Sequence, residues 1–202
     1  MVELFINGGS FMWPILGIFV LGLIFVGERL IHLISTLKFG EKFGGDVIKK
    51  LDSTGLLEAQ NYCEKGEGPI ANLFLVGLDR IEGGVDVVEK SIDAQANVEM
   101  ASLEKNMTWI ALCIATAPML GFLGTVWGMV GAFEAIAAAD NISAKIVAEG
   151  ISQALLTTAF GLVVAVVLQI LQNTVLYIID NQIVAIQKSV NSLLKSVESF
   201  SK

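Results

Sequence analysis

Three long runs of the sequence contain no charged residue and separate its apolar parts from its polar parts. The runs extend over residues 4–27, 106–133 and 150–179, and none of them contains Asp, Glu, Lys or Arg. About 20 consecutive apolar residues are enough to cross the hydrocarbon core of a bilayer. The pattern therefore predicts an all-α integral membrane protein with three transmembrane helices.

Beyond the third run, the hydrophobic positions follow a heptad spacing. The stripe consists of Ile179, Ile183, Ile186, Val190, Leu193, Val197 and Phe200. This repeat is typical of a helix that packs against other helices over its whole length. Followed backwards, the stripe passes through Leu176, Gln172, Gln169, Ala165, Leu162 and Thr158. The pattern predicts one helix of about 55 residues, about 80 Å long, that crosses the membrane and continues beyond it.

The polar segment between the first two runs also has helical spacing. Glycine-containing breaks at 44–45, 66–69 and 83–84 separate its stretches. After residue 84 the apolar residues Val88, Ile92 and Ala96 recur at every fourth position. The acidic residues Asp86, Glu89 and Asp93 occupy another face. This is an amphipathic helix, and we expect it to run without a break into the second span. We interpret its acidic face as a solvated surface, with a basic partner or an ion-attracting vestibule as the alternative.

The composition agrees with a membrane protein, and the cations indicate its orientation. Hydrophobic residues make up 54% of the chain and charged residues 16%, whereas about a quarter of a soluble domain is charged. Of the 13 Lys and Arg residues, only Lys145 lies between the second and third spans. The positive-inside rule then places the amino terminus in the periplasm and the carboxyl terminus in the cytoplasm.

These patterns divide the chain into six expected segments. They are an N-terminal segment with the first transmembrane helix (1–35), a cytoplasmic helical region (36–105), the second transmembrane helix (106–139), a short periplasmic loop (140–144), the third transmembrane helix (145–180) and a cytoplasmic C-terminal helix (181–202). The first run has no basic n-region and no A-x-A site after it, so we expect it to remain as an anchor. Two of the three spans thus belong to long helices that extend into the cytoplasm.

The sequence offers no chemistry for catalysis. The net charge of −7 and a pI of about 4.7 argue against a nucleic-acid partner. No Cys/His cluster has metal-ligand spacing and no phosphate-binding loop occurs, so we expect neither an enzyme nor a cofactor nor a metal. The single histidine, His32, is interpreted as an interfacial anchor. Cys63 and Cys113 are expected to be free thiols.

Small and polar residues mark the second and third spans. The small residues are Gly121, Gly124, Gly128 and Gly131 in the second span and Ala154, Thr158, Gly161 and Ala165 in the third. Such stripes allow close helix packing in lipid. Polar side chains accompany them, namely Thr125, Gln153, Thr157, Thr158, Gln169 and Gln172. In antiparallel helices Thr125 and Thr158 would both lie about 20 Å below the outer end. The pattern favours a polar ring on an ion path that lacks a titratable group at its centre.

Two stretches resemble the signatures of a known family. Residues 115–129, ATAPMLGFLGTVWGM, closely resemble the second-helix signature of the ExbB/TolQ/MotA proton-channel family, and residues 150–162, GISQALLTTAFGL, resemble its third-helix signature. The order of the spans also matches, and three spans make ExbB and TolQ more similar than MotA, which has four. The resemblance implies a pentamer around a dimer of a single-span ExbD/TolR-like partner, whose membrane aspartate carries the proton. Thr125 and Thr158 match the family's pore threonines.

The chain departs from the family pattern at two positions in the third span. Gln153 stands where the family often has Glu, and Val167 stands where it often has Pro. Without that proline no kink is required, so we expect a straighter helix. Glu149 precedes Gln153 by four residues and shares its helix face, near the helix start where the dipole favours an anion. It is a candidate replacement for the family's glutamate as outer proton relay; the alternative is a helix-start anion.

The resemblance predicts the channel subunit of a proton-driven motor in the bacterial inner membrane that energises a process at the outer membrane. A TonB-like or other periplasm-spanning protein is then a further candidate partner. Two alternatives remain: a non-conducting membrane scaffold and a stator for gliding or flagellar-type motility. The driven process and the choice of proton or sodium stay open.

Overall fold

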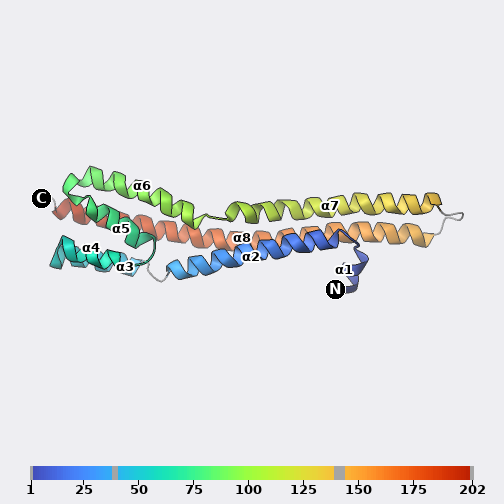
Figure 1. The fold of residues 1–202 in the computed structure, drawn as a ribbon, viewed down its shortest axis with the longest axis horizontal. Helices are drawn as coiled ribbons and strands as arrows, with labels where there is room; N and C mark the ends of the chain where they lie inside the picture. Colours follow the sequence, from blue (N-terminus) through green and yellow to red (C-terminus); the bar gives the residue numbers. More distant parts are fainter. Residues whose placement is uncertain (1, 38–40, 139–143, 201–202) are drawn as a thin grey trace. The chain divides into compact units, whose positions relative to one another are not determined.

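All regular elements of the described residues are helices. The computed structural model describes residues 2–37, 41–138 and 144–200 (Figure 1). In chain order the helices are α1 (Val2–Asn7), α2 (Met12–Leu37), α3 (Glu41–Thr54), α4 (Leu56–Glu64), α5 (Pro69–Asp79), the 3₁₀ turn η1 (Ile81–Gly83), α6 (Val85–Leu103), α7 (Met107–Ala138) and α8 (Ala144–Phe200). The predicted all-α class is confirmed for these residues.

Three apolar segments are long enough to cross a bilayer, as predicted. They lie within Met12–Thr36, Val85–Ala138 and Val147–Ser199. The predicted loop at 140–144 falls outside the described residues except for Ala144, which begins α8. The protein is therefore a multi-pass membrane protein built from helices.

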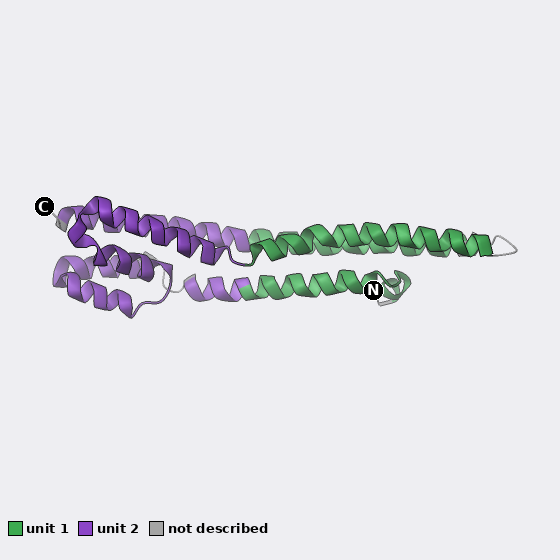
Figure 2. Cartoon of the chain, turned by 45° about the horizontal axis from the view of Figure 1, so that its top comes forward, with its two compact units in different colours: residues 1–28, 106–174 green, residues 29–105, 175–202 purple. Residues whose placement is uncertain are grey.

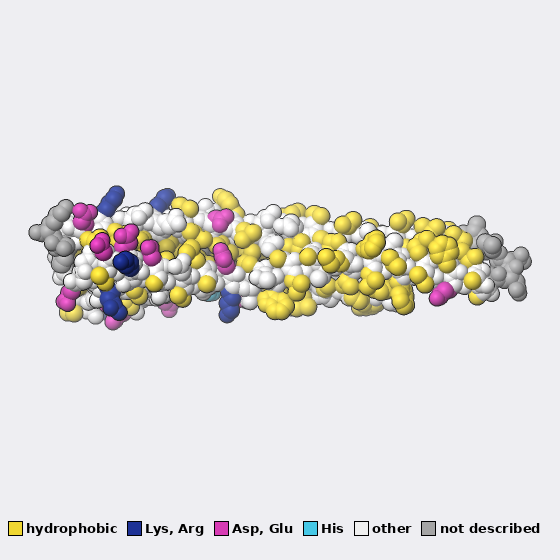
Figure 3. Space-filling model, turned by 90° about the horizontal axis from the view of Figure 1, so that it is seen from above, with side chains coloured by type: hydrophobic (Ala, Val, Ile, Leu, Met, Phe, Trp, Pro, Cys, Tyr) yellow, Lys and Arg dark blue, Asp and Glu magenta, His cyan; other side chains and the backbone are white. Residues whose placement is uncertain are grey.

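The chain forms two compact units, drawn in different colours in Figure 2. Unit 1 comprises Met1–Glu28 and Asn106–Thr174, and unit 2 comprises Arg29–Lys105 and Val175–Lys202. On the face shown in Figure 3, hydrophobic side chains dominate the surface of unit 1, whereas Lys, Arg, Asp and Glu gather over unit 2. The three charge-free runs thus belong largely to unit 1.

Within unit 1, α7 and α8 are antiparallel and in close contact through small residues. A Cβ at Gly161 would lie 2.6 Å from the carbonyl oxygen of Ala117, and one at Gly121 would lie 2.9 Å from that of Thr157. Gly128 packs against Ala154 in the same manner. In lipid, small residues let backbones approach and gain dispersion energy. The packing interpretation of the glycine stripe is therefore confirmed at these positions.

The stripe differs from the prediction at its outer end. Gly131 is exposed, and a Cβ there would meet nothing within 4 Å. The small residue that continues the contact is Ala132, which packs against Gly150. The period of an α-helix explains the shift, because four residues after Gly128 come back to the same face more closely than three.

The first span packs on the α7–α8 pair through an apolar cluster. Its buried members are Ile15, Cys113, Ala117, Val164, Ala165 and Leu168. Two aromatic side chains from the start of the chain extend this contact: the Phe5 ring meets Phe160 edge to face at 5.8 Å, and the Phe11 ring lies 6.2 Å from Trp127. The N-terminal segment is therefore fixed to both α7 and α8.

The long third helix forms as predicted, but its buried stripe changes position. α8 is one continuous helix of 57 residues. Ile179, Ile186, Leu193 and Val197 are buried as the heptad requires, whereas the side chain of Phe200 lies outside the described residues. The backward extension holds only in part: Ala165 is buried and Thr158 half-buried, whereas Leu162 and Leu176 are exposed in the single chain. In unit 1 other positions of α8 are buried as well, namely Ala154, Thr157, Gly161, Val164 and Leu168.

The expected continuous helix from residue 85 into the second span is also wrong. α6 ends at Leu103, and α7 begins at Met107 after a turn in which Asn106 has a φ of 65°. Asparagine is among the few residues other than glycine that adopt this left-handed conformation readily. Its side chain donates a hydrogen bond to Glu28 at 2.9 Å. Asn106, the polar residue that begins the second charge-free run, therefore separates α6 from α7, although neither Gly nor Pro is present at this turn.

Unit 2 packs four short helices against one another and the end of α8. Its buried core includes Val47, Leu51, Ala59, Cys63, Ile70, Leu73, Phe74, Leu78, Val88, Ile92, Ile179, Leu193 and Val197. The predicted break at 44–45 is wrong, because Gly44 lies inside α3, where a Cβ would be 3.3 Å from both the Phe74 ring and Ser189. The breaks at 66–69 and 83–84 are confirmed, and Gly55, with a φ of 94°, adds one.

Within unit 2, two buried polar side chains connect the end of α2 to α6 and α8. The Arg29 guanidinium, 2% exposed, donates to the carbonyl oxygen of Ser102 at 3.0 Å, near the end of α6. A cation at this place also meets the negative end of the helix dipole. Gln182 of α8 donates to the carbonyl oxygen of Leu33 at 3.0 Å. These bonds connect α2, α6 and α8.

Both cysteines are free, as expected, and both are buried. Burial raises the pKa of the Cys63 thiol to about 12, and the charge of Asp79 adds to the shift. Since the thiolate is the reactive form, this thiol is protected from alkylation in the folded protein.

Replacing Gly161 by alanine should destabilise the protein, because the added methyl group would press against the Ala117 carbonyl on the opposite backbone. Overpacking of this kind costs about 1–3 kcal/mol. Gly131→Ala is the matched control: its methyl group meets nothing in the chain, and alanine favours a helix over glycine by up to about 1 kcal/mol. Thermal unfolding in detergent, followed by tryptophan fluorescence, should show a lower midpoint for Gly161→Ala only. Equal midpoints would contradict the close contact.

Candidate functional site

Unit 1 brings Thr125 of α7 and Thr158 of α8 together. Their hydroxyl oxygens form a direct hydrogen bond, in which either can donate. Both side chains are half-buried between the helices. Because Gly121 has no side chain, its backbone carbonyl is within reach of both hydroxyls, at 3.2 Å from Thr125 and 3.0 Å from Thr158. The small residue thus places two polar side chains at one level of an otherwise apolar helix pair.

The two hydroxyls can exchange their donor roles without moving. If Thr125 donates to Thr158, then Thr158 donates to the Gly121 carbonyl; in the reverse arrangement Thr125 donates to the carbonyl of Gly121 or of Ala154, 3.3 Å away. A hydroxyl also has lone pairs beyond the bonds it makes as a donor. The pair can therefore accept a further hydrogen bond from water or from an acidic group of another chain in either arrangement.

The neighbouring Thr157 has a different position. It is 1% exposed, and its hydroxyl donates to the carbonyl oxygen of Ala154 on its own helix at 2.7 Å. A Cβ at Gly124 would lie 2.8 Å from the same hydroxyl. The sequence includes Thr157 among the candidate pore residues, whereas in the single chain its side chain packs in the α7–α8 contact and does not join the pair.

Gln153 contacts the N-terminal segment. Its side chain packs directly on the backbone at Gly9, in the turn between α1 and α2. Gly9 has a φ of 74°, which favours glycine, and it also leaves no room for a side chain against this amide. The turn before the first span therefore covers part of the candidate ion path on α8.

Glu149 lies with Gln153 in a polar pocket at the start of α8. The pocket has a volume of about 490 Å³ and is lined by Asn7, Lys145, Ala148, Glu149, Ser152 and Gln153. The Glu149 carboxylate is exposed and lies 3.8 Å from the ammonium group of Lys145. Glu149 and Gln153 thus share one helix face, and the carboxylate has the Lys145 ammonium group beside it.

The sequence analysis missed three residues of this region. Lys145 precedes Glu149 by four residues, a spacing at which opposite charges attract on a helix, so its pairing could have been predicted. The contacts of Asn7 and Gly9 join residues that are far apart in the sequence, and no pattern along the chain indicates them. None of the described residues forms a cluster of His, Cys, Asp and Glu that could hold a metal.

The site can bind and orient a proton donor but does not contain one. The second and third charge-free runs have no titratable carboxylate, histidine or amine between Met107 and Phe133 or between Gly150 and Tyr177. Threonine hydroxyls and glutamine amides donate and accept hydrogen bonds without changing charge near neutral pH. A proton that crosses the membrane beside this pair therefore needs a titratable group from outside these runs.

Comparison with known proteins identifies relatives over most of this region. The sequence model of the MotA/TolQ/ExbB proton channel family matches residues 65–188, more than half of the chain and all five candidate site residues. The chain is 30% identical over 184 residues to a biopolymer transport protein ExbB homologue of Methanothermobacter thermautotrophicus, covering 90% of this chain and 65% of that protein. It is 31% identical over 112 residues to the Tol-Pal system protein TolQ of Haemophilus influenzae, covering 55% and 49%.

A third relative is the biopolymer transport protein ExbB of Xanthomonas campestris pv. campestris, 40% identical over 81 residues. That match covers 40% of this chain and 32% of the relative. The chain thus spans less than two thirds of the length of these three relatives.

Proposed function

The chain belongs to the MotA/TolQ/ExbB proton channel family, in which it is most similar to ExbB and TolQ, and we propose that it is the channel subunit of a proton-driven motor. The motor lies in the bacterial inner membrane and drives transport or another process at the outer membrane. The amino terminus of the subunit is periplasmic and its carboxyl terminus cytoplasmic, which agrees with the distribution of Lys and Arg.

In the proposed assembly, five copies of the chain surround a dimer of a single-span ExbD/TolR-like protein. The second and third spans face the axis and the first span faces lipid. The partner provides the titratable carboxylate that these spans lack. A TonB-like or other periplasm-spanning protein would carry the motion onward. Moving one proton through 100 mV releases about 2.3 kcal/mol, enough to bias a packing rearrangement and too little to break a covalent bond.

The observation that carries this proposal is the hydroxyl pair of Thr125 and Thr158. Its two interchangeable donor arrangements leave an acceptor available for a protonated carboxyl group or a water molecule. Inside an apolar helix pair, such an acceptor can hold and orient a partner's protonated carboxyl group, or a water molecule to which that acid passes its proton. We assign Thr125 and Thr158 to the lining of the proton path, Gln153 to its outer part and Glu149 to the outer relay.

A non-conducting scaffold is the second candidate, and one observation favours it. The hydroxyls of Thr125 and Thr158 already hydrogen-bond each other and backbone carbonyls within one subunit, so they can serve helix packing alone. Both candidates use the contact between Thr125 and Thr158, so a measurement of proton flux is needed to distinguish them.

Native mass spectrometry of the detergent-extracted protein tests the assembly. We expect a homo-pentamer, because Phe122 of α7 and Leu155 of α8 are exposed in the single chain and can pack against the same faces of neighbouring copies, which adds dispersion contacts in lipid. Monomers and dimers alone would contradict the proposal.

Thr158→Val should abolish proton flux while leaving the protein folded. Valine nearly keeps the shape, and Thr125 can still donate to Gly121 or Ala154. Hydrogen bonds between membrane helices contribute about 0.6 kcal/mol on average, so stability should change little. We expect at least a tenfold loss of flux in vesicles that contain the chain and its partner, measured with a pH-sensitive dye under an imposed potential.

Two variants control this experiment. Thr158→Ser keeps the hydroxyl and should retain flux. Thr174→Val removes a hydroxyl of the same helix that bonds only its own backbone, at 2.9 Å from the Ile170 carbonyl, and should also retain it. Normal flux in Thr158→Val would refute the pore assignment and favour the scaffold.

Glu149→Gln should strongly reduce proton flux if Glu149 is the outer relay. Among the described residues that line the outer pocket, the substitution removes the one carboxylate and keeps the shape of the side chain. Combining it with Gln153→Glu should restore part of the flux, because a carboxylate returns one helical turn further in. The same vesicle assay measures both variants.

The control here is Lys145→Met, which removes the neighbouring cation without removing the carboxylate and should keep most of the flux. Normal flux in Glu149→Gln, or no recovery in the double variant, would make Glu149 a helix-start anion only.

A further inference from the structure

Two amide side chains of α8 lie apart from the candidate site described above. Gln169 and Asn173 are exposed in the single chain, and the Gln169 Nε2 atom donates to the Asn173 Oδ1 atom at 3.1 Å. This bond leaves an N–H group of Gln169 and the N–H groups of Asn173 available for further partners. The pair therefore has hydrogen-bonding capacity that the described chain does not use.

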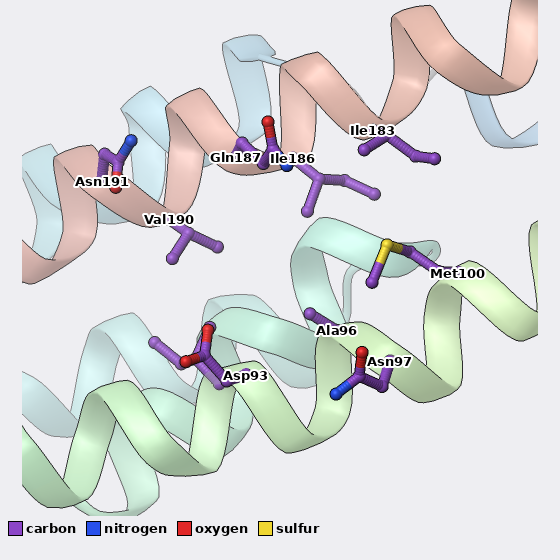
Figure 4. Close-up of a pocket in the computed structure, with 10 residues that line it drawn as sticks. Asp93, Ala96, Asn97, Met100, Ile183, Ile186, Gln187, Val190 and Asn191 are labelled. Atoms are coloured by element: carbon purple, nitrogen blue, oxygen red, sulfur yellow. The ribbon is translucent and has the colours of Figure 1, made fainter.

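The place of this pair in the chain makes that unused capacity informative. Amides also rim a groove in unit 2 between α6 and α8, where Asp93 adds a charge; they are Asn97, Gln187 and Asn191 (Figure 4). Gln169 and Asn173 belong instead to the third charge-free run and to unit 1. Their neighbour Ile170 is apolar and 61% exposed. Lipid tails have no hydrogen-bonding groups, so polar side chains inside a span face protein or a water-filled cavity.

Gln169 shares one face of α8 with Thr158. The helix is uninterrupted between them, and 11 residues at about 100° each return to within about 20° of the same direction. At 1.5 Å per residue, Gln169 lies about 17 Å further along the helix. Leu162, which stands between them on this face, is 51% exposed, so the single chain leaves the face open. The face of α8 that bears the hydroxyl pair thus carries a second polar group.

We propose that Gln169, paired with Asn173, lines the inner part of the proton path. The inference rests on the proposed function, in which Thr158 faces the axis of the assembly and the carboxyl end of the chain is cytoplasmic. Water is the occupant that the contacts favour, because it donates and accepts and so satisfies both amides in any arrangement. A cluster of polar partners is also what an ordered water molecule requires.

Both amides keep their charge near neutral pH, so they act as positioning residues. The partner's acid releases its proton to a water molecule at the hydroxyl pair and becomes a carboxylate. The excess proton passes along hydrogen-bonded waters, which the amides hold in place, and leaves on the cytoplasmic side. The carboxylate is then ready to take up the next proton from the outer side.

Thiol labelling at matched depth tests this placement. Gln169→Cys and Ile170→Cys are each reconstituted in vesicles with the single-span partner. Ile170 lies next to Gln169 and points about 100° away from it, so the two positions differ in face and hardly in depth. A permanently charged methanethiosulfonate, which modifies thiols that water reaches, is added on both sides of the membrane. The unsubstituted chain, whose Cys63 and Cys113 are buried, gives the background.

We expect Gln169→Cys to be labelled at least tenfold faster than Ile170→Cys, as measured by mass spectrometry. The label should lower proton flux at least fivefold, and dithiothreitol should restore it. Without label, Gln169→Asn keeps an amide and should retain most of the flux, whereas Gln169→Leu should lose at least fivefold. Ile170→Leu is the matched control and should leave the flux unchanged.

Equal labelling of the two positions, as contact with lipid or with a neighbouring copy would give, overturns the assignment of Gln169. Labelling of Gln169→Cys without a loss of flux overturns it as well. If Gln169→Cys conducts no protons before labelling, the labelling rates and the comparison of Gln169→Asn with Gln169→Leu decide. The proposed function stands in each case in which the unsubstituted chain and its partner conduct protons; if they do not, both proposals are overturned.

Discussion

The close approach of α7 and α8 determines the rest of unit 1. Lipid provides no hydrophobic drive for two apolar helices to associate, so dispersion contacts and interhelical hydrogen bonds must hold them together. The backbones at Gly121 and Gly161 come so near that a Cβ at Gly161 would lie 2.6 Å from the Ala117 carbonyl. The same nearness opens the Gly121 carbonyl to Thr125 and Thr158. Packing and polar chemistry therefore depend on one contact, and a larger residue there would disturb both.

The subunit concentrates its charge where water is available. The spans hold hydroxyls and amides that bond without titrating, while the carboxylates and ammonium groups gather in unit 2 and at the start of α8. Placing a charge in the spans would be expensive unless it were paired or close to water. In the proposed motor, the spans of such a subunit stay neutral while the partner carries the proton. The buried Arg29 is compatible with the same rule, because its guanidinium meets the end of α6 through the Ser102 carbonyl.

Patterns along the chain predicted the elements well and the contacts between distant residues poorly. The charge-free runs are long and the heptad of Ile179 to Val197 is periodic, so they identified the spans and the 57-residue α8. The turn at Asn106 was missed because one polar residue carries little signal, although its side chain bonds Glu28. The contact of Gly9 with Gln153 could not be predicted, since it depends on how the first span packs. Thr125 and Thr158 could be matched by depth because α7 continues without a break from Thr125 to Ala138 and α8 from Ala144 to Thr158.

The surroundings of Gln153 suit a neutral side chain at this position, where the family resemblance leads one to expect a glutamate. The side chain packs against the backbone turn at Gly9, a half-buried place where a charged carboxylate would lose hydration. An amide loses less there, because it is neutral and can still donate to a nearby oxygen. One turn outward, Glu149 is exposed and has Lys145 beside it, so its charge costs little. In the proposed relay, Glu149 therefore keeps an acid at the outer pocket, one turn outward from Gln153, while the N-terminal turn packs on the Gln153 side chain.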